Sequence, residues 1–147
     1  MEWTITLDEE KQYAEVVTTG VANKKKTLEM AKEISKVLSE AKIKKLLIDH
    51  SNIRAVSGEL VDIYQRPKEF KEIGVIPGIE VAEVVRADHK AFFSFLETVC
   101  INRGFFFLTF DDRNSALEWL FASTSHRKKN LLAPYLCWRQ NLNPRNT

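Results

Sequence analysis

Three adjacent residues carry the functional groups of a serine hydrolase: Asp49, His50 and Ser51 follow the apolar run Leu46-Leu47-Ile48. Catalysis by a Ser/His/Asp triad needs the three groups to converge on one point in space. Neighbouring residues of a strand point in alternating directions, so these three cannot form a triad by themselves. We therefore interpret them as the polar end of a strand that hydrogen-bonds to a turn, and we retain a binding role as the alternative.

Polar residues also follow the other predicted strands. Ligands of open α/β sheets bind outside the carboxyl ends of the parallel strands. If the chain has a site, the sequence favours this edge. The candidate binding residues, all predicted to lie there, are Asp49, His50, Ser51, Arg86, Asp88, Asp111 and Asp112.

The spacing of metal-ligating and nucleophilic residues favours no metal and no cofactor. Cys100 and Cys137 are too far apart for a metal or redox motif, and Cys100 is expected to be a buried small hydrophobe. His89, near a predicted helix start, is expected to face solvent. The five glycines are isolated, so no phosphate-binding loop is predicted. We predict that the chain is not an enzyme.

Phenylalanine is abundant, with nine residues in a chain of 147. Core packing explains most of them, and the alternative is an apolar pocket for a lipid-like ligand. Phe93 falls off the apolar stripe of its predicted helix, so an exposed Phe93 would mark a contact surface. That stripe comprises Ala91, Phe92, Phe95, Leu96 and Val99.

The elements that must position these residues alternate between strand and helix. Residues 3–7 and 13–19 alternate apolar and polar side chains and predict an antiparallel hairpin that ends at Gly20. Apolar residues at three- and four-residue spacing predict a helix capped by Asn23. Further strands are predicted over 46–48, 79–85 and 105–110, and further helices after Ser57 with a kink at Pro67, over 89–102, and after Asp111-Asp112.

This order, β-β-α-β-α-β-α-β-α, predicts an α/β fold. Strands that alternate with helices pair in parallel through right-handed crossovers. The sheet is therefore expected to be mostly parallel, with one antiparallel strand from the opening hairpin.

Composition indicates one globular domain and a separate tail. Residues 1–124 hold 17 Lys and Arg against 20 Asp and Glu, whereas residues 125–147 hold five basic residues and no acid. The mildly acidic domain has no nucleic-acid footprint. No apolar run approaches the ~20 residues of a membrane span, and the first residues lack a signal-peptide pattern. We expect a cytoplasmic domain over residues 1–124. The tail, 125–147, is expected to be poorly ordered or docked on a neighbour.

Three stretches resemble the SpoIIAA-like, or STAS-like, family of short bacterial proteins: residues 46–49, 81–85 and 110–120. The last is the most specific, because that family tends to end in Phe-Asp-Asp, then Ala, then Trp-Leu. The resemblance covers residues 1 to about 123. It implies the fold of anti-sigma-factor antagonists and of the STAS domains of sulfate transporters.

The resemblance also implies a candidate regulatory residue. Anti-sigma-factor antagonists carry an Asp-Ser-Ser-Gly-like motif after the third strand, and a kinase partner phosphorylates a serine in it. Here Ser57 and Gly58 stand near that place, but Val56 precedes them where the motif has Asp.

Two functions from different classes remain. The first is a non-catalytic protein-interaction or regulatory module, and the second is a binder of a small apolar or lipid-like ligand. The expected partner is accordingly an unknown protein or such a ligand, not nucleic acid, and self-association into a homodimer stays open.

The tail generates the first testable prediction. Deleting residues 126–147 is expected to leave the thermal midpoint of a dilute monomer nearly unchanged, because the alternating pattern is complete at Phe121. Self-association is expected to fall, because the run from Leu131 to Trp138 is apolar. Calorimetry and sedimentation measure the two effects. A large loss of stability in the monomer would place the tail in the core.

Overall fold

The computed structural model describes residues 1–76 and 78–122. The predicted tail, with His126 and Cys137, lies outside the described residues.

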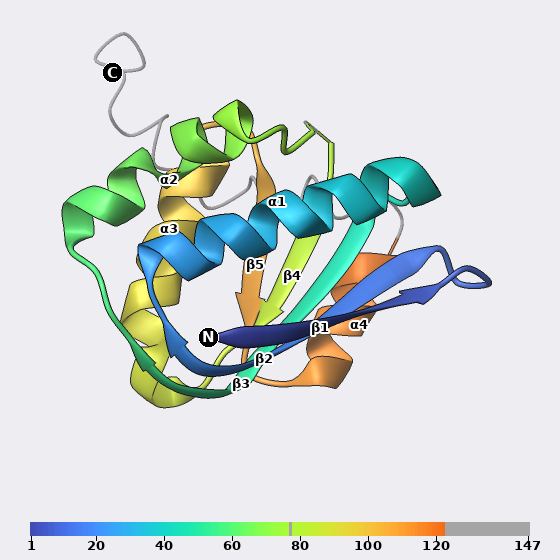
Figure 1. Ribbon diagram of the computed structural model, residues 1–147. Coiled ribbons are helices and arrows are strands. Elements are labelled where there is room, and N and C mark those ends of the chain that lie inside the picture. The colour runs from blue at the N-terminus through green and yellow to red at the C-terminus, as the bar shows by residue number, and fades with distance from the viewer. Residues whose placement is uncertain (77, 123–147) are drawn as a thin grey trace, which may run out of the picture.

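Five strands form one sheet in the order in which they occur along the chain (Figure 1). β1 pairs antiparallel with β2, and the other three pairings are parallel. The strands are β1 (Glu2–Asp8), β2 (Tyr13–Ala22), β3 (Lys45–Val56), β4 (Glu80–Val84) and β5 (Phe106–Phe110). The predicted fold class, a mostly parallel sheet with an opening antiparallel hairpin, is confirmed.

The predicted ends of β2 and β3 were wrong. β2 continues through Gly20, whose backbone has φ +88°, and pairs with β3 as far as the Ala22–Val56 pair, with two shifts of register on the way. β4 pairs with β3 only as far as Asp49. The second half of β3 is thus held by β2, beyond the end of β4. Residues 49–51 consequently lie inside a strand of twelve residues and do not end it.

Helices cover both faces of the sheet unequally. α1, α2 and α3 share one face, and α4 packs alone on the other (Figure 1). A short 3-10 turn, η1 (Ala87–His89), precedes α3. The helices are α1 (Lys24–Ala41), α2 (Leu60–Glu72), α3 (Lys90–Asn102) and α4 (Arg113–Phe121). Within the described residues, no helix is long and apolar enough to cross a membrane.

Helix starts were predicted well where the signal is local. Asn23 caps α1 by accepting a hydrogen bond from the Lys26 amide at 2.9 Å, and Asp112 caps α4 through the Ser115 amide at 2.8 Å. Ser57 does not cap α2. Its cap is Glu59, which forms a capping box with Asp62.

The buried side of α3 differs from the predicted stripe. Phe93 is only 4% exposed, whereas Ala91 is exposed. The reason is that α3 is covered twice, by the sheet and by α2, whose Ile63 packs in the same apolar cluster as Phe93. A prediction that assumes one buried face of the helix misses the residues of the second buried face. The hypothesis that Phe93 marks an exposed contact surface is wrong.

Candidate functional site

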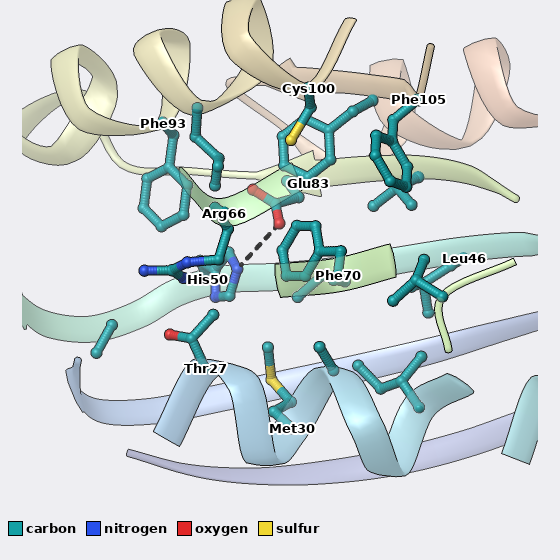
Figure 2. Close-up of a pocket in the computed structure, with 18 of the residues that line it drawn as sticks. Thr27, Met30, Leu46, His50, Arg66, Phe70, Glu83, Phe93, Cys100 and Phe105 are labelled. Atoms are coloured by element: carbon teal, nitrogen blue, oxygen red, sulfur yellow. Dashed lines mark ion pairs between the residues drawn. The ribbon is translucent and has the colours of Figure 1, made fainter. Parts of the chain in front are cut away.

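An apolar cavity of about 90 Å³ lies between the sheet and helices α1, α2 and α3. The strands supply alternate residues to its floor, so that Leu46, Ile48 and His50 of β3 all point into it. Figure 2 shows α1 on one side of the cavity and α3 on the other, with Phe70 of α2 between them.

Five phenylalanines contribute to the lining of this cavity. They come from three different elements or their flanks, and Phe93 packs against both Phe92 and His50. The concave apolar space that the ligand hypothesis requires is therefore present. The five are Phe70, Phe92, Phe93, Phe105 and Phe107.

Three predicted site residues line the cavity, Ser57, Phe93 and His50, and His50 is the polar side chain among them that is buried. It is 4% exposed, and its ring stacks on that of Phe93 with 4.9 Å between centroids. Its Nδ1 lies 2.7 Å from the hydroxyl of Thr18, and its Nε2 lies 3.4 Å from Oε1 of Glu83. The interpretation of His50 as part of a polar strand end was wrong.

We assign the protons of His50 from these contacts. The single hydroxyl hydrogen of Thr18 is donated to the backbone oxygen of Asp49 at 3.1 Å, so we assign His50 Nδ1 as a donor to Thr18. Nε2 then faces the Glu83 carboxyl group. Two bare acceptors would repel each other in a buried site. We therefore assign one proton to this contact, which makes the pair neutral as a unit.

Arg66 is the third member of what we call the polar cluster: His50, Glu83 and Arg66. It projects from α2, lines the cavity and is 4% exposed. Among the described residues its one ionic contact is from Nε to Glu69 at 3.5 Å, and Nε has no hydrogen-bond partner. Burial lowers the pKa of Arg66, although Glu69 and Asp62 oppose that effect.

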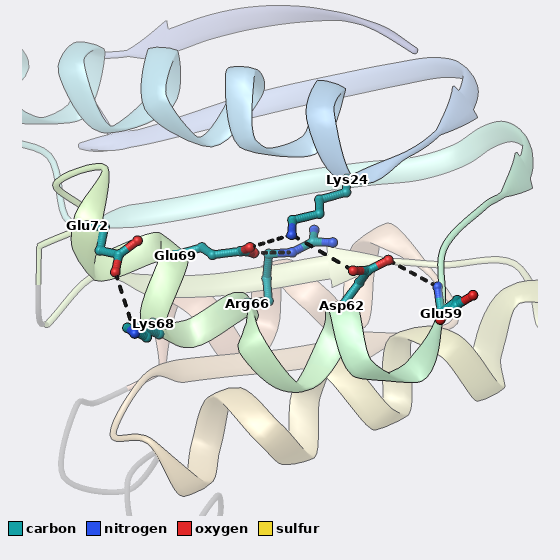
Figure 3. A network of polar contacts seen from close by, with 7 residues as sticks. All are labelled: Lys24, Glu59, Asp62, Arg66, Lys68, Glu69 and Glu72. Atoms are coloured by element: carbon teal, nitrogen blue, oxygen red, sulfur yellow. Dashed lines mark hydrogen bonds and ion pairs between the residues drawn. The ribbon is translucent and has the colours of Figure 1, made fainter.

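Arg66 belongs to a polar network that links α1 to α2 (Figure 3). Lys24 of α1 contacts Glu69 at 2.8 Å and Asp62 at 3.8 Å. Asp62 also accepts a hydrogen bond from the amide of Glu59 at the start of α2. Glu69 thus serves two cations at once, which leaves Arg66 only partly compensated.

Cys100 lines the cavity opposite the sheet and is fully buried. Burial raises the pKa of its thiol well above the usual range, and the nearby Glu83 adds to that effect. The thiolate is the reactive form of cysteine, so Cys100 is inert, as expected from the sequence.

The remaining predicted site residues are not brought together with His50. Asp49 accepts a hydrogen bond from the amide of Ser51 at 2.9 Å and makes no contact with the His50 ring. Arg86 and Asp88 form an exposed pair with an N–O distance of 2.9 Å. Asp111 is exposed and lies 3.5 Å from Lys90.

The two remaining predicted residues, His89 and Ser57, lie near the ends of helices and differ in exposure. His89 does not face solvent freely, because its side chain is 12% exposed and its Nε2 lies 3.4 Å from the backbone oxygen of Ile53. Ser57 is exposed beside the opening of the cavity, with its hydroxyl 3.3 Å from the backbone oxygen of Ala22.

Sequence reasoning missed Glu83, Arg66 and Glu97. Both faces of β4 are covered, so the side chain of Glu83 is buried. Glu97 accepts hydrogen bonds from the amide and hydroxyl of Thr109, and burial raises its pKa. Nothing in β4 itself indicates burial on both faces, because two of its five residues are glutamates.

The shared proton generates a prediction about Glu83. Glu83→Ala is expected to lower the free energy of unfolding by about 3 kcal/mol or more, because it leaves Nε2 of the buried His50 without a partner. Glu83→Gln is expected to cost about 1 kcal/mol or less, because its amide can donate to Nε2. Urea unfolding at pH 7 measures both. Equal losses in the two variants would contradict the assignment.

Comparison with solved structures identifies the fold of this chain. The chain is similar to an anti-sigma factor antagonist from Mycobacterium paratuberculosis, with 13% identity and a TM-score of 0.53 over 81% of this chain and 94% of that one. It is also similar to an uncharacterised protein with a SpoIIAA-like fold from Shewanella loihica, with 20% identity and a TM-score of 0.50 over 81% and 92%. No protein-family model and no curated protein matches the sequence. The chain therefore has a SpoIIAA-like fold, as the resemblance of its sequence implied.

Proposed function

We propose that the chain is a non-catalytic regulatory module that acts by binding a protein partner through the outer face of α2. The observation that carries this proposal is a pair of exposed apolar side chains on that face. Val61 is 62% exposed and Tyr64 is 58% exposed. Residues three apart are neighbours on a helix surface, so the two form one patch.

The chemistry of the patch suits a protein partner. Arg103 lies over the ring of Tyr64, with 5.4 Å to the centroid, so the patch combines an aromatic ring with a cation. Tyrosine and arginine are the residue types that most often dominate binding energy at protein interfaces. A structural neighbour that is an anti-sigma factor antagonist adds support for a regulatory role.

The absence of a convergent catalytic set supports a non-catalytic role. Within the described residues, Asp49 and Ser51 bond to each other and not to His50. Cys100 is buried with a raised pKa. No three potential metal ligands gather in the part of the chain that the structure describes.

Ser57 is the proposed site of regulation by phosphorylation. Its exposure and its position three residues before α2 make it accessible to a kinase. Glu59 and Asp62, which form the capping box of α2, lie close by in the chain. A phosphate there would meet like charges. Phosphorylation would therefore loosen the start of the helix that carries the patch.

The interaction function is tested by charge placed in the patch. Tyr64→Glu is expected to weaken binding of a partner by about tenfold or more, because a carboxylate is costly to desolvate in an interface. Ser39→Glu, at an exposed position of α1 and with the same change of charge, is the matched control and should retain the partner. Capture from native cells identifies the partner, and titration of the purified pair measures the affinity. Equal affinity of both variants would exclude this face.

A second candidate function is supported by the cavity. We propose that it holds a small apolar ligand, because its lining is apolar apart from a few polar groups, as in ligand sites generally. This function is compatible with the first, since the cavity and the outer face of α2 lie on opposite sides of one helix.

The ligand function is tested by filling the cavity. Ser35 lines it and is 7% exposed, whereas Ser39, one turn further along α1, is exposed. Ser35→Leu is expected to abolish any ligand that co-purifies with the protein, and Ser39→Leu to retain it. Native mass spectrometry of protein purified from its own cells measures the bound mass. A ligand retained equally by Ser35→Leu would lie elsewhere.

A further inference from the structure

We propose that the cavity binds a short-chain monocarboxylate, with the carboxylate held by Arg66 and the alkyl chain in the apolar end; this inference rests on the proposed ligand function.

The first argument is the incomplete pairing of Arg66. A guanidinium carries five N–H donors, and a buried charge is stable only when it is paired and hydrogen-bonded. Within the described residues, Arg66 has one ionic contact, at 3.5 Å to a carboxylate that Lys24 holds more closely, at 2.8 Å. Its Nε lacks any hydrogen bond. A planar carboxylate matches the guanidinium through two parallel hydrogen bonds.

The second argument is charge balance. The groups around Arg66 are Lys24 of α1, Asp62 and Glu69 of α2, Cys100 of α3, His50 of β3 and Glu83 of β4. Two cations face two carboxylates, the thiol is neutral and the His50–Glu83 pair shares one proton. The described groups are therefore balanced, and a bound monocarboxylate would add one net negative charge, the smallest addition that an anion can make. A dianion such as a phosphate monoester would leave a second charge unpaired in a site that excludes water.

The third argument is the arrangement of polar and apolar groups along the cavity. Figure 2 shows His50, Arg66 and Thr27 toward one end, and Leu46 and Phe105 toward the other. The polar head of a ligand is thus expected at the end with Arg66 and its apolar chain at the end with Leu46, which is the order that an amphipathic molecule needs.

Cavity size limits the length of the alkyl chain. An apolar cavity of about 150 Å³ holds one benzene molecule, which has six carbon atoms. On that scale a space of about 90 Å³ takes roughly four carbon atoms. With the carboxylate beside Arg66, the preferred ligands are straight or branched acids of about four to six carbons.

The experiment compares acids with alcohols of the same length. The full-length protein is titrated by calorimetry with the straight-chain acids from acetate to decanoate at pH 7, and with butanol, pentanol and hexanol. Affinity is expected to peak near pentanoate, and the matched alcohol to bind about tenfold or more weakly, because it lacks the charge-assisted hydrogen bonds. This comparison needs no variant.

Two variants locate the carboxylate. Arg66→Met is expected to remove the preference for the acid and to leave alcohol binding, whereas Lys68→Met, at an exposed position of the same helix, should behave as the unaltered protein. If Arg66→Met does not fold, the ratio of acid affinity to alcohol affinity in the unaltered protein tests the carboxylate assignment.

Each outcome separates this inference from the ligand function on which it rests. Alcohols that bind as tightly as acids, with Ser35→Leu blocking both, would overturn the carboxylate assignment and leave an apolar ligand site. No binding of either series, together with a co-purified ligand that Ser35→Leu excludes, would overturn the ligand class alone. No binding and no co-purified ligand would overturn both.

Discussion

The parallel pairing of β2 with β3 is the constraint on which the site depends. It extends from the Ala14–Leu46 pair to the Ala22–Val56 pair, further than any other pairing in the sheet. It keeps β3 extended past residue 49, and the strict alternation of a strand then turns His50 toward the cavity and Asp49 away from it. The same pairing carries the chain out to Ser57, so that α2 returns across the cavity and does not lie directly on the sheet.

Signals that act within a few residues were predictable from the sequence. Asn23 and Asp112 cap their helices because a side-chain oxygen need only reach an amide three residues on. The order of strands and helices followed from periodicity, since each element repeats its pattern several times. The resemblance of residues 110–120 to one family indicated the fold correctly.

What escaped prediction depends on residues far apart in the chain. The burial of Phe93 requires that α2 cover a second side of α3, and no pattern within α3 reports that. His50 and Glu83 are 33 positions apart and meet only because β3 and β4 are neighbours in register, with Ile48 opposite Glu83. Arginine is usually exposed, and the burial of Arg66 depends on the packing of α1, α3 and the sheet around it.

Among the described helices, α2 is the one with a proline inside it. It packs mainly on α1 and α3, and Pro67 in its middle offers no N–H to the carbonyl oxygen of Ile63. Such a helix opens locally at a lower free energy than the strands beneath it. Because α2 covers the cavity, the local unfolding of α2 also lets a molecule enter the cavity. The hydrogen-exchange rate of the α2 amides and the rate of ligand entry then both report the local unfolding of α2. A ligand bound in the cavity therefore slows hydrogen exchange throughout α2, although it does not touch the outer face of that helix.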